Sequence, residues 1–159
     1  MSMQIREATL QDAQLIADLT RATWAGKVAA SSSGHRETAE AATNHLQVGG
    51  GFILLINDQA VGSVRWLPLP DQPGTWEMLR MSVLPAYRGA NLSQQLIEAV
   101  IQQACLEGVT ELRLAVRADQ PRLLDLYSAY EFEEAPELEY THANPLEAAP
   151  TVMRRILKS

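Results

Sequence analysis

Two different spacings of hydrophobic residues alternate along this chain. Between Leu92 and Cys105 the apolar residues recur at helical spacing, with Gln and Glu on the opposite face, so this segment is predicted to be an amphipathic helix. The segment from Phe52 to Leu67 is rich in β-branched and aromatic residues on both sides of NDQ, which predicts a hairpin. Similar patterns predict further strands at residues 3–8, 75–83, 109–117, 136–142 and 151–157, and further helices after residue 9, over 37–46 and over about 119–130.

The predicted element order is therefore β-α-α-β-β-β-α-β-α-β-β, which is an α/β fold in a single domain covering residues 1–159. Residues 75–117 form a β-α-β unit, whose crossover is expected to be right-handed and to join two parallel strands. The order predicts a mixed sheet of about seven strands flanked by about four helices. Cys105 lies on the apolar stripe of the helix and is expected to be buried there.

The composition narrows the class of protein further. The formal net charge of −6 argues against general nucleic-acid binding, which requires a basic face. No apolar run approaches the roughly 20 residues that a membrane span needs, and the N-terminal segment lacks the apolar region of a signal peptide. Cys105 is the one cysteine, so no disulfide can form within the chain. We therefore expect a cytoplasmic protein that does not bind membranes.

The stretch LPAYRGANLSQQL, from Leu84 to Leu96, joins a predicted strand to a predicted helix. The first N–H groups of a helix lack internal partners and carry partial positive charge. Arg88 adds a charged donor, and Gly89 lets the backbone approach a ligand closely. The turn favours a phosphate, best a diphosphate. The alternative is a plain connection with a surface arginine, because a phosphate turn usually contains more than one glycine.

The longer stretch LRMSVLPAYRGANLSQQLIEAV, from Leu79 to Val100, resembles the acyl-CoA-binding segment of the GNAT N-acetyltransferase superfamily. Members have a strand that ends in Val-x-Pro-x-Tyr/Trp-Arg-Gly, and then a turn of the form Arg/Gln-x-x-Gly-x-Gly/Ala. Arg88 fills the first position of that turn. Asn91 and Ser93 stand where the two glycines would be; Asn tolerates the left-handed conformation, and both residue types cap helices.

A second segment, ADQPRLLDLYSAYEF, resembles the family pattern Asn-x-x-Ala-x-x-Leu-Tyr-x-x-x-Gly-Phe. Tyr127 and Phe132 match it in register. Gln120 replaces the Asn, Leu123 the Ala and Glu131 the Gly. If the backbone at Glu131 requires a positive φ, this substitution costs about 1 kcal/mol. The chain is thus identified as a divergent member of the superfamily.

The resemblance implies the GNAT fold and acetyl-CoA, or another acyl-CoA, as the acyl donor. The diphosphate would lie on the turn that begins at Arg88, and the pantetheine arm would pair like an extra strand beside Met81–Val83, with the amide of Val83 on the thioester carbonyl. The residues implied to bind the cofactor are Met81, Ser82, Val83, Arg88, Gly89, Ala90, Asn91, Leu92, Ser93 and Gln120.

The resemblance also implies direct attack of an amine on the thioester, with no enzyme nucleophile. Tyr127 matches the tyrosine that protonates the departing thiolate; the alternative is a core aromatic whose hydroxyl bonds a neighbour. Glu77 matches a position that holds a general base in some members; the alternative is a solvent-facing strand residue. His35, His45 and His142 have no metal-ligand spacing, so no metal is predicted, and each is expected to be an ordinary polar residue.

The acceptor is a small-molecule amine or an amine of a peptide or protein. The segments Trp24–Glu37 and Thr141–Pro150 would wall its cleft, but their residues indicate no particular amine. Two other functions stay open: a catalytically silent acyl-CoA-binding sensor or interaction module, and an interaction protein with no nucleotide ligand. Dimers are common in the family, so the resemblance is compatible with a homodimer.

Overall fold

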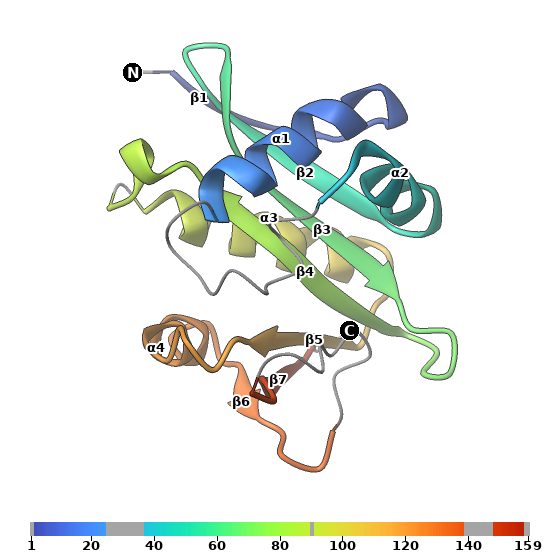
Figure 1. Cartoon of the computed structure of the whole chain (residues 1–159). Coiled ribbons are helices and arrows are strands. Elements are labelled where there is room, and N and C mark those ends of the chain that lie inside the picture. The colour runs from blue at the N-terminus through green and yellow to red at the C-terminus, as the bar shows by residue number, and fades with distance from the viewer. Residues whose placement is uncertain (1, 25–36, 90, 139–147, 158–159) are drawn as a thin grey trace.

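The computed structural model describes residues 2–24, 37–89, 91–138 and 148–157. One seven-stranded sheet of order β1-β2-β3-β4-β5-β7-β6 runs through these residues, with α1 and α2 on one face and α3 on the other (Figure 1). The strands are β1 (Met3–Glu7), β2 (Gly50–Ile56), β3 (Gln59–Pro68), β4 (Thr75–Val83), β5 (Glu111–Val116), β6 (Glu133–Glu134) and β7 (Thr151–Ile156). The helices are α1 (Ala13–Trp24), α2 (Ala39–Val48), α3 (Leu92–Leu106) and α4 (Arg122–Ser128), with 3-10 turns at Leu10–Asp12 and Pro85–Tyr87.

The element order agrees with the predicted one from end to end, and the α/β fold class with seven strands and four helices is confirmed. The hairpin of β2 and β3 turns at Asn57 and Asp58, which both adopt left-handed conformations as a tight two-residue turn requires. The unit β4-α3-β5 joins two parallel strands, as expected. No helix in the described ranges is long and apolar enough to cross a bilayer.

Apolar side chains of α3 pack against one face of the sheet and form the main core. Leu96, Ile97 and Val100 of this helix are fully buried. Trp66 on β3 stacks on Trp76 on β4, with ring centroids 5.1 Å apart and planes 12° from parallel. Because these large rings and the helix are close-packed, β3 and β4 form a rigid base for whatever binds along β4.

The expectation that Cys105 is buried is wrong, because this residue is exposed. The helical stripe is buried through Ala104, and Cys105 lies one residue further round the helix, in its last turn beside the exposed Leu106. A residue at the end of a helix and at the margin of its apolar stripe receives little cover from the sheet.

The strand predicted at residues 136–142 is also wrong in its described part. The observed β6 lies earlier, at Glu133–Glu134, where it pairs with Met153 and Arg154 of β7. Pro136 has no N–H to continue the ladder, and the N–H of Leu138 instead donates to Ala135 at 3.0 Å in a turn. Residues 139–142 lie outside the described residues.

An ion pair ties the end of β1 to the start of the first helix. Arg6 donates to both carboxylate oxygens of Asp12, at 2.9 and 2.8 Å, and the N–H of Thr9 also donates to Asp12 at 2.8 Å. The hydrogen bond from Arg6 lowers the pKa of the Asp12 carboxyl to about 2 from an ordinary 3.8, and the Thr9 bond acts in the same direction. Asp12 thus forms a capping box with Thr9 at the start of this helical segment.

We predict that Asp12→Asn removes a pH-dependent part of the stability. Because the folded-state pKa is depressed, this part is present above the ordinary pKa of 3.8 and is lost as the pH falls through about 2. The variant should be less stable at pH 7 by roughly 1 kcal/mol, discounted for the solvent around Arg6, and the difference should close near pH 2. Urea denaturation across this range measures it, with Asp71→Asn as the surface control; a constant difference at every pH would contradict the prediction.

We also predict that Glu131→Gly stabilises the protein. Glu131 has a φ of 67°, the left-handed conformation that its match to a glycine suggested, so glycine should gain about 1 kcal/mol. The ion pair with Arg155 at 3.1 Å would be lost, but Glu131 is 79% exposed, so this contact is worth little. Glu131→Gln is the control, since it removes the charge and keeps the strained backbone. Equal melting temperatures for the glycine and glutamine variants would refute the strain argument.

Candidate functional site

Parallel strands β4 and β5 pair over only part of their length. Their register joins Thr75 to Glu111, Trp76 to Leu112 and Glu77 to Arg113, and no further pair follows although β4 continues to Val83 and β5 to Val116. Figure 1 shows the two strands running apart beyond this point. The edge of β4 that faces β5 is therefore open from Met78 onward.

A β-bulge in β4 accompanies this divergence. Ser63 of β3 pairs with Ser82 and Arg65 pairs with Leu79, so Arg80 and Met81 together face the single residue Val64. Arg80 has a φ of 56°, which long side chains seldom adopt. A bulge increases the local twist and re-aims the side chains of its strand, so it helps to separate β4 from β5.

The open edge presents the N–H of Val83, the amide that was expected to bind the thioester carbonyl. The next residue, Leu84, donates its N–H to Val61 of β3 at 2.8 Å. Successive N–H groups of an extended strand point to opposite sides, so the N–H of Val83 points away from β3 and toward the divergence. Met81, Ser82 and Val83 thus line the open edge as a short strand without a partner on that side.

The turn between β4 and α3 contains two residues in left-handed conformations. Gly89 has a φ of 88°, and Asn91, the N-cap of α3, has a φ of 60° and a ψ of 24°. The main chain therefore turns left-handed at Asn91, where the family has a glycine. Gln95 donates its N–H to the carbonyl of Asn91 at 3.3 Å, so the N–H groups of Leu92 and Ser93 precede the hydrogen bonds of the helix.

The contacts of Arg88 and Gly89 in this turn differ from those expected from the sequence. The Arg88 guanidinium donates through Nη2 to the carbonyl of Thr23 at 3.2 Å, which ties the turn to the C-terminal end of α1. A Cβ built on Gly89 would meet nothing within 4 Å, so glycine is needed here for its positive φ rather than for space. Ala90 lies outside the described residues.

Tyr127 lies on α4, which follows β5, and belongs to the same buried cluster as Val83 and Val116. Its ring meets that of Phe132 edge to face, with centroids 5.9 Å apart. Burial raises the pKa of the Tyr127 phenol, so the hydroxyl keeps its proton at neutral pH. Within the described part of the chain, no hydrogen bond to this hydroxyl is found, in contrast to the alternative in which a neighbour binds it.

Glu77 and Gln120 occupy opposite sides of the divergence. Glu77 is buried, at the last paired position of β4 and β5, which excludes the solvent-facing alternative. Gln120 is half-buried in the turn between β5 and α4, where its N–H donates to Arg117 at 3.0 Å and its carbonyl accepts from Leu123 at 3.1 Å.

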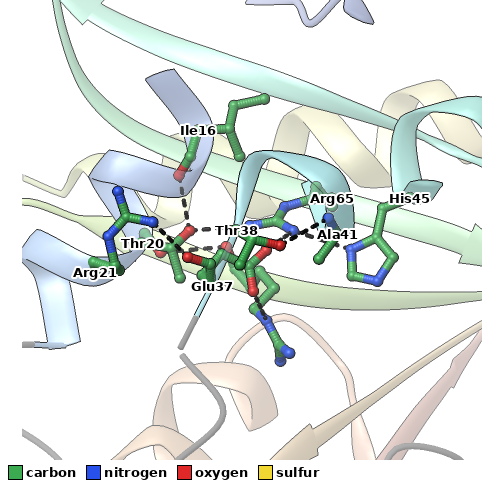
Figure 2. Close-up of polar contacts among 10 residues, drawn as sticks. Ile16, Thr20, Arg21, Glu37, Thr38, Ala41, His45 and Arg65 are labelled. Carbon is green, nitrogen blue, oxygen red and sulfur yellow. Dashed lines mark hydrogen bonds and ion pairs between the residues drawn. The ribbon is translucent and has the colours of Figure 1, made fainter. Parts of the chain in front are cut away.

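A buried ionic network, which the sequence analysis did not identify, underlies the bulge (Figure 2). Glu37 accepts one hydrogen bond from Arg65 and a second, at 3.2 Å, from Nε of Arg80. Arg65 also contacts Nδ1 of His45 and donates to the hydroxyl of Thr20, each at 3.0 Å. The network joins α1, α2, β3 and β4. A charged residue in the middle of each of two apolar strands was the signal that could have revealed it.

Charge and burial act against each other in this network. Burial alone would raise the pKa of the Glu37 carboxyl, but Arg65 and Arg80 together hold it below its ordinary value, so Glu37 is ionised. Burial lowers the pKa of Arg65, and Glu37 opposes that shift. A guanidinium stays charged under such shifts, so the network holds one carboxylate between two cations.

Trp24, the last residue of α1, lies between two arginines of the site. The guanidinium carbon of Arg80 is 5.7 Å from the centroid of its ring, and that of Arg117, just beyond β5, is 5.0 Å away. These are cation–π contacts, and they bring the strands β4 and β5 and the helix α1 together around one indole. Of the other acceptor candidates, residues 25–36, including His35, and residues 139–147, including His142, lie outside the described residues.

Solved structures share this fold over nearly the whole chain. A PaiA N-acetyltransferase from Thermoplasma acidophilum, in complex with coenzyme A, has a TM-score of 0.79 at 16% identity, over 99% of this chain and 100% of that one. The ribosomal-protein-S18-alanine N-acetyltransferase from Escherichia coli has a TM-score of 0.78 at 17% identity, over 99% of this chain and 96% of that one. At these identities the likeness shows the fold.

A third structure, an acetyltransferase of the GNAT family from Staphylococcus aureus Mu50, has a TM-score of 0.77 at 17% identity, over 99% of this chain and 100% of that one. No curated protein matches the chain. The sequence model of the Acetyltransferase (GNAT) family matches residues 15–132, which contain both motif segments. Because this match covers more than half of the 159 residues, the chain belongs to the GNAT acetyltransferase family.

Proposed function

We propose that the chain is an N-acetyltransferase that moves an acetyl group from acetyl-CoA to a primary amine, by direct attack within a ternary complex. The open edge of β4, which leads straight into the left-handed turn at Asn91, is the observation that carries this proposal. An extended ligand arm can pair with such an edge, and its diphosphate can bind at the helix start that follows.

The donor site uses the backbone more than the side chains. Met81, Ser82 and Val83 offer hydrogen-bonding groups to the pantetheine arm, and the N–H groups from Gly89 to Ser93 bind the diphosphate. The left-handed conformation of Asn91 supports this proposal, because it lets the turn form without the glycine of the motif. The coenzyme A bound to the Thermoplasma structure of the same fold gives independent support.

Acetyl-CoA brings an activated acetyl group, whose transfer breaks the thioester C–S bond and forms a C–N bond to the amine. Val83 stabilises the negative charge that develops on the carbonyl oxygen, through an N–H directed into the divergence. One such fixed donor typically lowers the barrier by about 3 kcal/mol. The rigid packing of β4 holds this donor in place before the reaction begins.

Tyr127 then donates its hydroxyl proton to the departing thiolate. Its buried position and raised pKa keep the proton available at neutral pH. Glu77, buried at the point where β4 and β5 separate, accepts the proton that the amine must lose, directly or through water. The proposed acid and base thus lie on either side of the divergence, one on α4 and one on β4.

We predict that acetyl-CoA binds the wild-type chain and that the turn at Asn91 controls the affinity. Asn91→Val should weaken binding about tenfold or more, because a β-branched residue disfavours a φ of 60°. Asn91→Gly is the matched control and should bind at least as well as wild type. Calorimetric titration measures both. An absence of heat and of thermal shift with the wild type at millimolar ligand would exclude acetyl-CoA as the donor.

We further predict that Tyr127→Phe lowers turnover by about tenfold or more and preserves the melting temperature and the affinity for acetyl-CoA. Thiol release with a panel of amines measures the rate. Tyr130→Phe is the matched control from the turn after α4: its hydroxyl contacts Glu98 at 3.3 Å, and its removal should leave the rate unchanged. An unaltered rate in Tyr127→Phe would eliminate the general-acid role.

The same assay on the wild type decides between the two functions. If the wild type binds acetyl-CoA but releases no thiol with any amine, the chain is a silent acyl-CoA-binding module instead.

A further inference from the structure

The network beneath the bulge carries more positive than negative charge. Two guanidinium groups, of Arg65 and Arg80, contact the single carboxylate of Glu37, and the other partners of Arg65 are the neutral hydroxyl of Thr20 and an imidazole nitrogen of His45. Among these contacts of the described residues, one positive charge is unbalanced. A partly buried cation is unfavourable without an anion nearby, so the arrangement favours the arrival of a second anion.

The backbone of Arg80 indicates that its side chain is needed at this position. A φ of 56° inside a strand is taken most easily by glycine or asparagine, and an arginine there stores strain of about 1 kcal/mol or more. If only the bulge mattered, a smaller residue would form it at lower cost. Strained residues of this kind concentrate at ligand-binding sites.

The guanidinium of Arg80 is fixed in direction and still has donors to offer. Its Nε donates to Glu37 at 3.2 Å, and the indole of Trp24 lies 5.7 Å from its central carbon. Neither Nη group has a hydrogen bond in the described part of the structure, and the side chain is 14% exposed. Four N–H donors are thus held in a rigid, nearly buried fork, the geometry that a carboxylate accepts in bidentate fashion.

The position of Arg80 separates it from the diphosphate turn. Arg80 precedes Val83 by three residues, which corresponds to roughly 10 Å of extended strand. The turn at Gly89 follows Val83 and is therefore further still from Arg80. Its side chain reaches Glu37 and Trp24, on the sheet face that α1 and α2 cover. An anion bound there would lie on the far side of the thioester from the diphosphate, where the acceptor must stand.

We propose that Arg80 binds a carboxylate of the acceptor, so that the substrate is an amino-carboxylate such as a free amino acid rather than a simple amine. This inference rests on the proposed acetyl transfer. Trp24 covers the guanidinium, and Glu37 fixes its orientation through Nε. Arg117 also contacts the indole of Trp24, but it is paired with Asp119 at 3.2 Å. Arg80 is therefore the arginine of this site that we assign to the acceptor carboxylate.

The first test uses wild-type protein and matched substrates. Phenylalanine, leucine and lysine are each compared with the amine that lacks the carboxylate and with the methyl ester, in a thiol-release assay with acetyl-CoA. In at least one set we expect the free carboxylate to raise kcat/KM about tenfold or more over both analogues. Equal or better use of the decarboxylated amines in all sets would overturn the proposal and leave the acetyltransferase function intact.

The second test is Arg80→Asn, which keeps a residue suited to the left-handed backbone. It should lower kcat/KM for the carboxylate substrate about tenfold or more and change the decarboxylated amine less than about threefold, with the affinity for acetyl-CoA preserved. Equal losses for both substrates would show a merely structural role and refute the proposal. Arg154→Gln, which removes a surface ion pair with Glu137, is the control and should change neither substrate. If the variant fails to fold, the wild-type comparison alone decides.

A binding measurement separates the two proposals if no amine releases thiol. In that case the proposed catalysis fails, and N-acetylphenylalanine, N-acetylleucine and N-acetyllysine are titrated into wild-type protein in the presence of coenzyme A. Binding that is lost in Arg80→Asn would support the carboxylate site. The absence of binding to the wild type, or equal binding to the variant, would overturn it.

Discussion

The candidate site depends on a break in the pairing between two parallel strands. β4 and β5 are held together at three residue pairs and then diverge, so one side of β4 keeps backbone groups that no neighbouring strand uses. Unpaired strand edges are normally a liability, since they can bind other chains. Here the edge belongs to a strand in the middle of the sheet, whose other side is paired with β3, so only the side toward β5 is left open. The proposed contacts with the pantetheine arm and with the thioester follow from this opening.

The bulge at Arg80 and the ion pairs of Glu37 stabilise that opening from the other face of the sheet. Glu37 lies in the segment before α2 and is only 3% exposed, yet it holds Arg65 of β3 and Arg80 of β4 at once. Removing one partner of such a buried pair typically costs about 3–5 kcal/mol, because the other charge is then left uncompensated. The network therefore holds the bulge of β4 in place. Its carboxylate comes from Glu37, which precedes β2 in the sequence.

Local patterns in the sequence predict most of the fold and the donor turn, because these depend on residues close together in the chain. The element order and the full length of β4 follow from spacing, and the motif register marks Asn91 and Glu131 as the positions where glycine is replaced, which is where the structure has left-handed conformations. The network could not be predicted in this way. Glu37 meets Arg65 across 28 residues and Arg80 across 43, and such contacts exist only once the strand register is set. The same holds for β6, whose place is decided by pairing with β7.

One strand then serves both halves of the proposed reaction. Val83 presents its N–H to the open edge, and Arg80, three residues earlier, directs its guanidinium to the face covered by α1 and α2. Because both belong to β4, and β4 is packed on α3 through Trp76, a shift of the strand would move the donor and acceptor contacts together. The strain at Arg80 has a physical role in this arrangement: the bulge that opens the donor edge also turns the arginine out of the sheet. An acceptor held by its carboxylate would thus be aligned with the thioester by the same element that activates it, while Trp24 and Glu37, at the two ends of the segment expected to wall the cleft, hold the guanidinium of Arg80 in place.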